Sequence, residues 1–419
     1  MASEVGRSRA VSLDEATLAH AKRIVDDVRA RGDVGVREWG ERLGDVAVGV
    51  PLVLGREELR RAFEGLPREQ RELLERTAER IRAFAQSQRA CLSELDVAVP
   101  GGRAGHTVAA VRVAGCYAPG GRFPLPSSVL MTAVTARAAG VERVIVASPK
   151  AAAVTVAAAF VAGADELLAV GGAQAVAAMA YGTQTVARCD VIVGPGNKWV
   201  TAAKKLVFGD VGIDMLAGPS ELLVLCDDTA DAGLVAADLL AQAEHDEDAV
   251  PGLVTTSEDV VRAVEDEIET RLSTLPTAAT ARAAMRNGYA VVVGSVEEGV
   301  RVSDEIAPEH LEIMVRDSES VARACRNYGA VFLGSRSAEI FGDYGVGPNH
   351  VLPTSGTARF CGGLSVLHFL RVRTWLRMEE GDAARGVAQD AAVLARLEGL
   401  EGHARAAEVR EMRFGRPGT

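Results

Sequence analysis

Apolar residues recur at helical spacing in the first hundred residues of the chain. Within residues 12–33 one stripe comprises Leu18, Ala21, Ile24, Val25 and Val28. Ser12 and Glu15 have the spacing of a capping box, which predicts a helix that starts there. Residues 68–95 form a second block with one highly charged face. Both blocks therefore predict amphipathic helices.

Short apolar runs replace this pattern between residues 111 and 225. The runs that we expect to form buried parallel strands are residues 143–147, 166–170 and 191–193. Gly or Pro and then an Ala-rich helical stretch follow each run, which is typical of βαβ units. A second series of such strands is predicted at residues 222–225, 252–256, 290–293 and 330–333.

The last part of the chain has a different character. After Arg371 we expect mostly helix, and residues 382–410 are charged and rich in Ala and Leu, as in an arm that packs on something else. A chain of 419 residues is too long for a single core. The prediction is an α/β protein with two Rossmann-like, doubly wound α/β domains and a small helical C-terminal arm.

Charge and cysteine usage narrow the class of protein. The net charge of −11, with no block of Lys and Arg, argues against a nucleic-acid partner. Six Cys residues without CxxC spacing indicate reduced thiols. The N-terminus shows no apolar signal segment, and the Ala-rich run 151–164 is shorter than the roughly 18 residues that a membrane span needs. We therefore expect a cytoplasmic protein without a membrane partner.

Three of the seven His residues lie in short blocks beside carboxylate or amide groups. Gln242 and His245 are spaced to share one helix face, so that both can reach one cation. Taken alone, this pair is also typical of an exposed polar helix end. Glu309 and His310 follow a Pro and suit general acid/base chemistry, although a solvated turn has the same composition.

The third block is a loop with three Gly and one Pro between residues 342 and 350. Such a loop holds a tight shape, and it would place Asp343 and His350 in a fixed geometry; an ordinary turn is the alternative. Together the three blocks predict a metal-assisted active site that is assembled from distant segments.

Three Gly-rich turns connect predicted strands to predicted helices. They are residues 117–121, 171–174 and 193–197. Turns of this kind offer free N–H groups at a helix N-terminus, which suits an anion or a dinucleotide. None has the GxGxxG pattern, so each is a weak dinucleotide signal by itself. All three lie at the carboxyl ends of predicted strands, where doubly wound folds bind ligands.

In combination these blocks resemble the histidinol dehydrogenase family, from about residue 15 to residue 410. The matching motifs are residues 117–121, 126–131, 171–174, 193–197, 211–215, 217–221, 242–245, 307–310, 347–350 and 398–400. The resemblance implies a zinc- and NAD-dependent homodimer. Such an enzyme oxidises the alcohol of L-histidinol to the carboxylate of L-histidine in two hydride transfers, through an aldehyde that is not released.

The resemblance also assigns roles to residues of this chain. It implies zinc ligands at Gln242, His245, Asp343 and His403, with His403 on an arm that crosses to the partner subunit. Glu309 and His310 would be the catalytic pair. Substrate would contact Ser220, His350 and Glu398, and the dinucleotide would contact Tyr117, Gln174 and Asn197.

This resemblance divides the chain into four segments. Residues 1–112 would contain N-terminal helices and part of the first α/β domain, and residues 113–221 the second, dinucleotide-binding domain. Residues 222–371 would complete the first domain with the zinc and catalytic residues. Residues 372–419 would form the arm that is exchanged in the dimer.

Some positions depart from the family pattern. They are residues 123–125, Thr135, Trp199 and much of segment 359–375. Residues 401–405 also resemble paralogues that oxidise other small polar alcohols, such as sulfopropanediol. A paralogue with the same zinc and NAD chemistry is thus the alternative. A non-catalytic binding protein is a third hypothesis, but its expected mark, loss of Glu309 or His310, is absent.

Overall fold

The computed structural model describes residues 13–120 and 123–414 and consists of two compact units. Unit 1 contains the chain up to Ser87 together with Val111–Phe369, and unit 2 contains Gln88–Ala110 together with the chain from Leu370 onward. In the described part of the chain, no helix is both long and apolar enough to cross a membrane.

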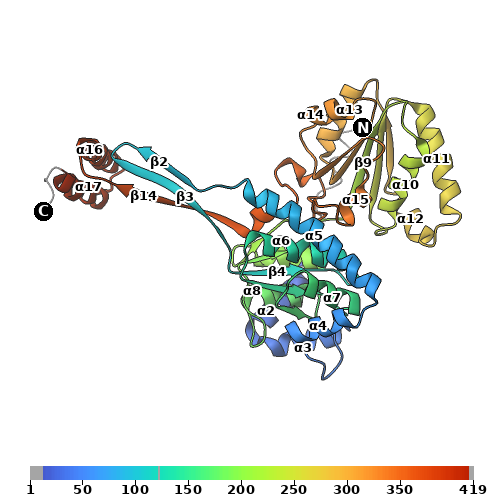
Figure 1. Ribbon diagram of the computed structural model, residues 1–419, viewed down its shortest axis with the longest axis horizontal. Coiled ribbons are helices and arrows are strands. Elements are labelled where there is room, and N and C mark those ends of the chain that lie inside the picture. Colours follow the sequence, from blue (N-terminus) through green and yellow to red (C-terminus); the bar gives the residue numbers. More distant parts are fainter. Residues whose placement is uncertain (1–12, 121–122, 415–419) are drawn as a thin grey trace. The chain divides into compact units, whose positions relative to one another are not determined.

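The first sheet of unit 1 has six strands, parallel except for β1 at one edge (Figure 1). In spatial order they are β1 (Val53–Gly55), β6 (Glu166–Leu168), β5 (Arg143–Ala147), β4 (Val113–Tyr117), β7 (Val191–Val193) and β8 (Gly212–Ile213). The connecting helices are α6 (Pro126–Ala139), α7 (Ala153–Val161), α8 (Gly172–Tyr181) and α9 (Lys198–Val207). Central strands β4, β5 and β7 are almost fully buried, as the predicted runs at β5 and β7 indicated.

The second sheet of unit 1 has five parallel strands. Their order is β11 (Tyr289–Val292), β10 (Val250–Thr255), β9 (Glu221–Cys226), β12 (His310–Met314) and β13 (Ala330–Leu333). The helices are α10 (Ala232–Ala243), α11 (Glu258–Leu272), α12 (Ala278–Ala284), α13 (Val296–Ile306), α14 (Ser318–Ala324) and α15 (Glu339–Asp343), followed by two 3-10 turns at Thr357–Arg359 and Val366–Phe369.

Alternate residues of β9 serve two separate apolar cores, one on each face of this sheet. Leu222 and Val224 pack with α10 and α11, whereas Leu223 and Leu225 pack on the opposite face with α13. Helices thus cover both faces, and the prediction of an α/β protein with parallel sheets is confirmed.

The N-terminal helices are α2 (Glu15–Arg31), α3 (Asp33–Arg42), α4 (Arg56–Glu64) and α5 (Arg68–Ala90). The predicted stripe on α2 is buried at Ala21, Ile24, Val25 and Val28. The predicted cap was wrong, because the side chain of Asp14 accepts the bond from the backbone N–H of Thr17. Ser12 lies outside the described residues.

Unit 2 combines an antiparallel sheet with two helices. The sheet has the order β14 (Leu370–Met378), β3 (Gly102–Ala110) and β2 (Leu95–Val99). The helices are α16 (Asp382–Leu397) and α17 (Glu401–Phe414), whose shared core consists of Ala side chains. The expectation of mostly helix after Arg371 was therefore incomplete, and the predicted boundary after residue 371 falls inside β14. That strand forms because it pairs along its whole length with β3, which the sequence pattern near residue 371 does not reveal.

Candidate active site

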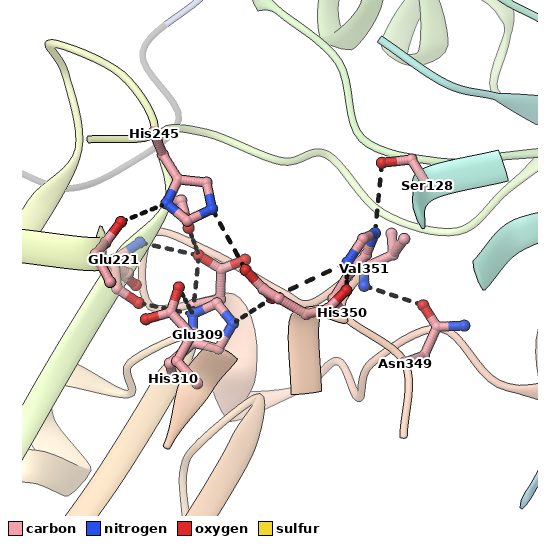
Figure 2. Close-up of polar contacts among 12 residues, drawn as sticks. Ser128, Glu221, His245, Glu309, His310, Asn349, His350 and Val351 are labelled. Atoms are coloured by element: carbon pink, nitrogen blue, oxygen red, sulfur yellow. Dashed lines mark hydrogen bonds and ion pairs between the residues drawn. The ribbon is translucent and has the colours of Figure 1, made fainter. Parts of the chain in front are cut away.

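The candidate catalytic pair lies at the amino ends of two neighbouring strands of the five-stranded sheet. β9 begins at Glu221 and β12 begins at His310, and the two strands are paired. The Oε2 atom of Glu309 accepts hydrogen bonds from Ser220 Oγ at 2.7 Å and from the backbone N–H of Glu221 at 2.9 Å (Figure 2). Parallel pairing thus brings two segments far apart in the sequence into direct contact.

The backbone before the pair is tightly shaped. Helix α13 ends at Ile306, and Ala307 adopts a left-handed conformation with φ of 50° before Pro308. The carbonyl groups of Pro308 and Glu309 then accept bonds from the N–H groups of Gly329 and Ala330, each at 2.9 Å. The predicted helix stop at Pro308 is confirmed, and His310 is already the first residue of the strand.

His310 is a buried, neutral imidazole. Its Nδ1 lies 3.1 Å from the carbonyl oxygen of Glu221, and since a carbonyl only accepts, Nδ1–H donates. Nε2 therefore carries the lone pair, and it lies 3.9 Å from Oδ1 of Asp343. Burial lowers the pKa of His310 to about 4, so the ring stays unprotonated at neutral pH.

Glu309 has the opposite shift for the same physical reason. Burial disfavours its charged form and raises the pKa of Glu309 to about 8, helped by the nearby carboxylates of Glu221 and Asp343. Its two hydrogen bonds favour ionisation but do not outweigh burial. The two neighbouring groups thus offer bases of very different strength.

Gln242 and His245 stand at the end of α10. Gln242 is fully buried in the last helical turn, and His245 follows the helix end by two residues. The Nδ1–H of His245 donates to the carbonyl of Ala241 at 3.0 Å, so Nε2 faces Oδ2 of Asp343 at 3.3 Å. Burial alone would lower the pKa of His245, but Asp343 raises it to about 9. The Asp343 carboxylate therefore makes this position favourable for a positive charge.

The Gly-rich loop holds Asp343 and His350 together, as predicted. His350 donates from Nδ1 to the backbone carbonyl of Asp343 at 3.1 Å, and its Nε2 lies 3.4 Å from Ser128 Oγ on α6 (Figure 2). Gly345 has φ of 80°, and a side chain there would strike Thr77 of α5. Arg80 of the same helix donates to the carbonyl of Gly345 at 2.6 Å. Helix α5 therefore supports the loop.

Glu339 is a member of this cluster that sequence reasoning missed. It is 3% exposed, and its carboxylate lies beside the Gln242 amide, which with its nitrogen toward Glu339 donates to the two oxygens at 3.0 and 3.1 Å. Ligand atoms of His245, Glu339 and Asp343 all lie within 4.8 Å of one another. Glu339 precedes Asp343 by four residues, a one-turn spacing that could have been noticed.

The charges of the cluster fit a bound cation. Glu309, Glu339 and Asp343 crowd together, and among the described imidazoles beside them only His245 has a raised pKa. Burial and the neighbouring carboxylates of Asp343 and Glu309 hold the pKa of Glu339 well above its usual range. A divalent metal would relieve this repulsion, and nitrogen and oxygen donors without thiolate suit zinc.

The turns of the six-stranded sheet differ from the prediction of free N–H groups. The N–H of Gly171 donates to Oδ2 of Asp45 at 3.0 Å, and that of Gly172 donates to the Tyr117 hydroxyl at 3.1 Å. Asn197 caps its own helix, α9. The prediction was wrong here because side chains of the protein already fill these donors. Tyr117 and Gln174 are buried, and Asn197 is exposed.

A buried ion pair fills the third of these turns. Oδ2 of Asp214 accepts the N–H of Gly194 at 2.7 Å, and Lys204 donates both to Asp214 and to the carbonyl of Gly194, at 3.1 Å in the latter case. Gly194 has φ of 115°, and a side chain there would strike the carbonyl of Tyr117.

The remaining predicted site residues, Glu398 and His403, belong to unit 2. Glu398 caps the end of α16 and His403 lies in the first turn of α17, and both are exposed.

The chain is similar to known proteins over nearly its whole length. A family model described as histidinol dehydrogenase matches residues 7–411. The histidinol dehydrogenase of Thermus thermophilus is 45% identical over 404 residues, which are 96% of each chain. The histidinol dehydrogenase of Halobacterium salinarum is 46% identical over 94% of this chain and 93% of its own. A crystal structure of histidinol dehydrogenase from Elizabethkingia anophelis matches with a TM-score of 0.91 and 30% identity over 97% of this chain and 95% of that chain.

Proposed function

This chain belongs to the histidinol dehydrogenase family, and on that premise we propose that it oxidises L-histidinol to L-histidine with NAD as the hydride acceptor. The observation that supports this chemistry best is the buried Glu309–His310 pair beside the cation-attracting group of His245, Glu339 and Asp343. The reaction has two hydride transfers with a bound aldehyde between them, and each oxidation releases a proton that a base must accept.

His310 is the base for the alcohol step. Its Nδ1–H is held by the Glu221 carbonyl, so Nε2 is free to take the proton of the substrate hydroxyl as hydride leaves the adjacent carbon. Because burial lowers the pKa of His310 to about 4, the ring is unprotonated when substrate arrives. The protonated ring, an acid with a pKa of about 4, then releases the proton to solvent water before the second oxidation.

Glu309 is the base for the aldehyde step. It takes a proton from water, and the resulting hydroxide adds to the aldehyde carbon to form the hydrate that loses the second hydride. A carboxyl whose pKa is raised to about 8 is a stronger base than an ordinary Glu. Ser220 and the N–H of Glu221 orient the carboxylate through Oε2.

The proposed zinc ligands are Gln242, His245 and Asp343, with His403 from a second subunit. Zinc bound there would hold and orient the nitrogen atoms of the substrate. Within this chain, His245 has the arrangement of metal-binding imidazoles, in which the distal N–H is fixed by a carbonyl, here that of Ala241. Ser220, His350 and Glu398 would contact substrate, and Tyr117, Gln174 and Asn197 the dinucleotide.

The place of His403 and Glu398 in unit 2 supports the proposal of an active site that is shared in a homodimer. The helices of that unit have a core of small Ala side chains and expose Leu394, Leu397 and Met412, so they need a further surface to pack on. Reciprocal exchange across a two-fold axis supplies one.

Mixing two inactive variants tests the exchange. In a heterodimer of His403→Ala and His310→Ala subunits, one site regains both residues only if they come from different chains. We expect up to about a quarter of wild-type activity after random mixing. No recovery, with subunit exchange verified by mass spectrometry of tagged subunits, would show that each chain builds its own site.

The identity of the alcohol is tested directly with purified protein. Formation of NADH should be fastest with L-histidinol, at two NADH per substrate. A family paralogue is the second candidate, because Thr135, where the chain departs from the family pattern, accepts a bond from Asn349 beside His350 at 3.2 Å. Turnover of sulfopropanediol or another polar alcohol in preference to histidinol would favour the paralogue.

A further inference from the structure

Asp45 is an acidic residue that reaches a predicted dinucleotide turn from a distant segment. It lies after α3, yet its Oδ2 accepts from the backbone N–H of Gly171 at 3.0 Å and from Nε2 of Gln174 at 2.8 Å. Both bonds use Oδ2, and Oδ1 makes none within the described part of the chain. A carboxylate therefore stands where a helix N-terminus would otherwise attract a phosphate.

The backbone around Asp45 keeps it in this position. The N–H groups of Asp45 and Val46 both donate to the carbonyl of Gly40, at 2.8 and 3.4 Å. Val46 is buried, and a side chain at Gly40 would meet both Val46 and Val170, which precedes the turn. The close packing of this segment makes the carboxylate a fixed feature of the site.

Asp45 also decides how Gln174 presents its amide. Because a carboxylate only accepts, the Gln174 nitrogen must face Asp45, and the amide oxygen points away. That oxygen is buried and has no described hydrogen-bond partner, as is true of the nearby Ser148 hydroxyl. An unpaired buried acceptor is unfavourable, so a donor from outside the chain would stabilise these atoms.

We propose that Asp45 is the residue by which the nucleotide site selects NAD over NADP. This inference rests on the proposed function and on Gln174 as part of the dinucleotide site. A ribose diol offers hydroxyl donors, which Oδ1 of Asp45 accepts, since that atom makes no hydrogen bond within the described part of the chain. A 2′-phosphate offers only acceptors and negative charge, and it would meet a carboxylate at a turn whose N–H groups are already used.

Lys150 supplies a positive charge near Asp45. It is exposed, has a left-handed φ of 48° and follows Pro149, which packs against Gly171. Its positive charge is close enough to favour the ionised form of Asp45, although burial raises the pKa of that carboxyl. With Asp45 neutralised, the ammonium group becomes available to a phosphate.

The test measures binding of NAD and NADP to the full-length protein by calorimetry and by quenching of Trp fluorescence. Asp45→Asn and Asp45→Ser remove the charge, and Ser retains a cap for α8 if Asn fails to fold. We expect the NADP-to-NAD affinity ratio to rise at least about tenfold in both. The double variant Asp45→Ser/Lys150→Ala should lose that gain. Asp26→Asn, an identical change in the exposed Lys22–Asp26 pair, is the control and should leave the ratio unchanged.

The outcomes separate this inference from the proposed function. If the folded Asp45 variants lose NAD and NADP affinity equally, the residue is structural and the inference fails while the function stands. If wild-type protein binds neither nucleotide, the proposed function fails, and the inference with it. If wild type already binds NADP as well as NAD, selectivity by Asp45 is refuted although the oxidation chemistry remains.

Discussion

Buried carboxylates have different partners at the two large sheets of unit 1. At the carboxyl edge of the six-stranded sheet, the buried Asp214 is satisfied by backbone N–H groups and by Lys204. At the amino edge of the five-stranded sheet, Glu309, Glu339 and Asp343 crowd against one another. The first arrangement is complete within the chain, and the second calls for a cation.

This difference shows that the partners of a buried carboxylate indicate whether it has a structural or a functional role. A buried carboxylate with enough donors stabilises the fold, and its removal should unfold the protein before it alters chemistry. A buried carboxylate among other carboxylates destabilises the metal-free fold, and it persists because a ligand or reaction uses it.

Removal of the catalytic pair should have the largest effect. We expect His310→Ala to slow alcohol oxidation, and Glu309→Ala to slow oxidation of supplied aldehyde, each by about 10²–10⁴. Separate rate measurements with alcohol and with aldehyde check this, with zinc content as a control. Equal small losses in both steps for both variants would contradict the division of roles.

Asp214→Asn should act on stability in the six-stranded sheet. It leaves Lys204, which is 2% exposed, without its charged partner, so we expect a loss of about 3–5 kcal/mol in the free energy of unfolding. Urea unfolding measures the loss, and Asp165→Asn, in a half-exposed pair with Arg137, is the control with a smaller effect. An Asp214→Asn variant with an unchanged free energy of unfolding would show that this ion pair does not stabilise the fold.

Neutralising Glu309 should have the opposite effect on the metal-free protein. The folded pKa of about 8 exceeds the ordinary Glu pKa of 4.5, so Glu309 contributes stability that is present below pH 4.5 and lost as pH rises through about 8. Glu309→Gln should therefore gain roughly 2–4 kcal/mol over wild type between pH 5 and pH 8. Urea midpoints at both pH values check this, with exposed Glu319→Gln as control. A difference that is independent of pH would show that crowding does not govern the site.

Glu339→Gln should weaken metal binding without abolishing it. Its carboxylate orients the Gln242 amide and adds negative charge beside His245 and Asp343, so we expect a loss of about 10–100-fold in zinc affinity. Competition with a chelating dye measures the affinity, and His245→Ala should lose far more. Unchanged zinc affinity would place Glu339 outside the metal site.

The strands and the catalytic blocks were predictable because their signals are local. The run 144–147 is apolar throughout, and Gly345 with its neighbours marks a shaped loop. Asp45 and β14 were not predictable, since each depends on a partner more than a hundred residues away. The positions of the Gly turns were evident from the sequence. Only the tertiary fold determines which side chains accept hydrogen bonds from their N–H groups.

The pairing of β14 with β3 has a consequence for synthesis of the protein. β3 ends at Ala110 and its partner begins at Leu370, so the ribosome makes the hairpin of β2 and β3 long before the strand that completes it. At ordinary elongation rates of about 5–20 residues per second, one edge of β3 stays open for roughly 10–50 s. An open edge of this kind pairs readily with the same strand of another nascent chain. Efficient production in a heterologous host should therefore depend on a low concentration of nascent chains or on a chaperone that shields this edge.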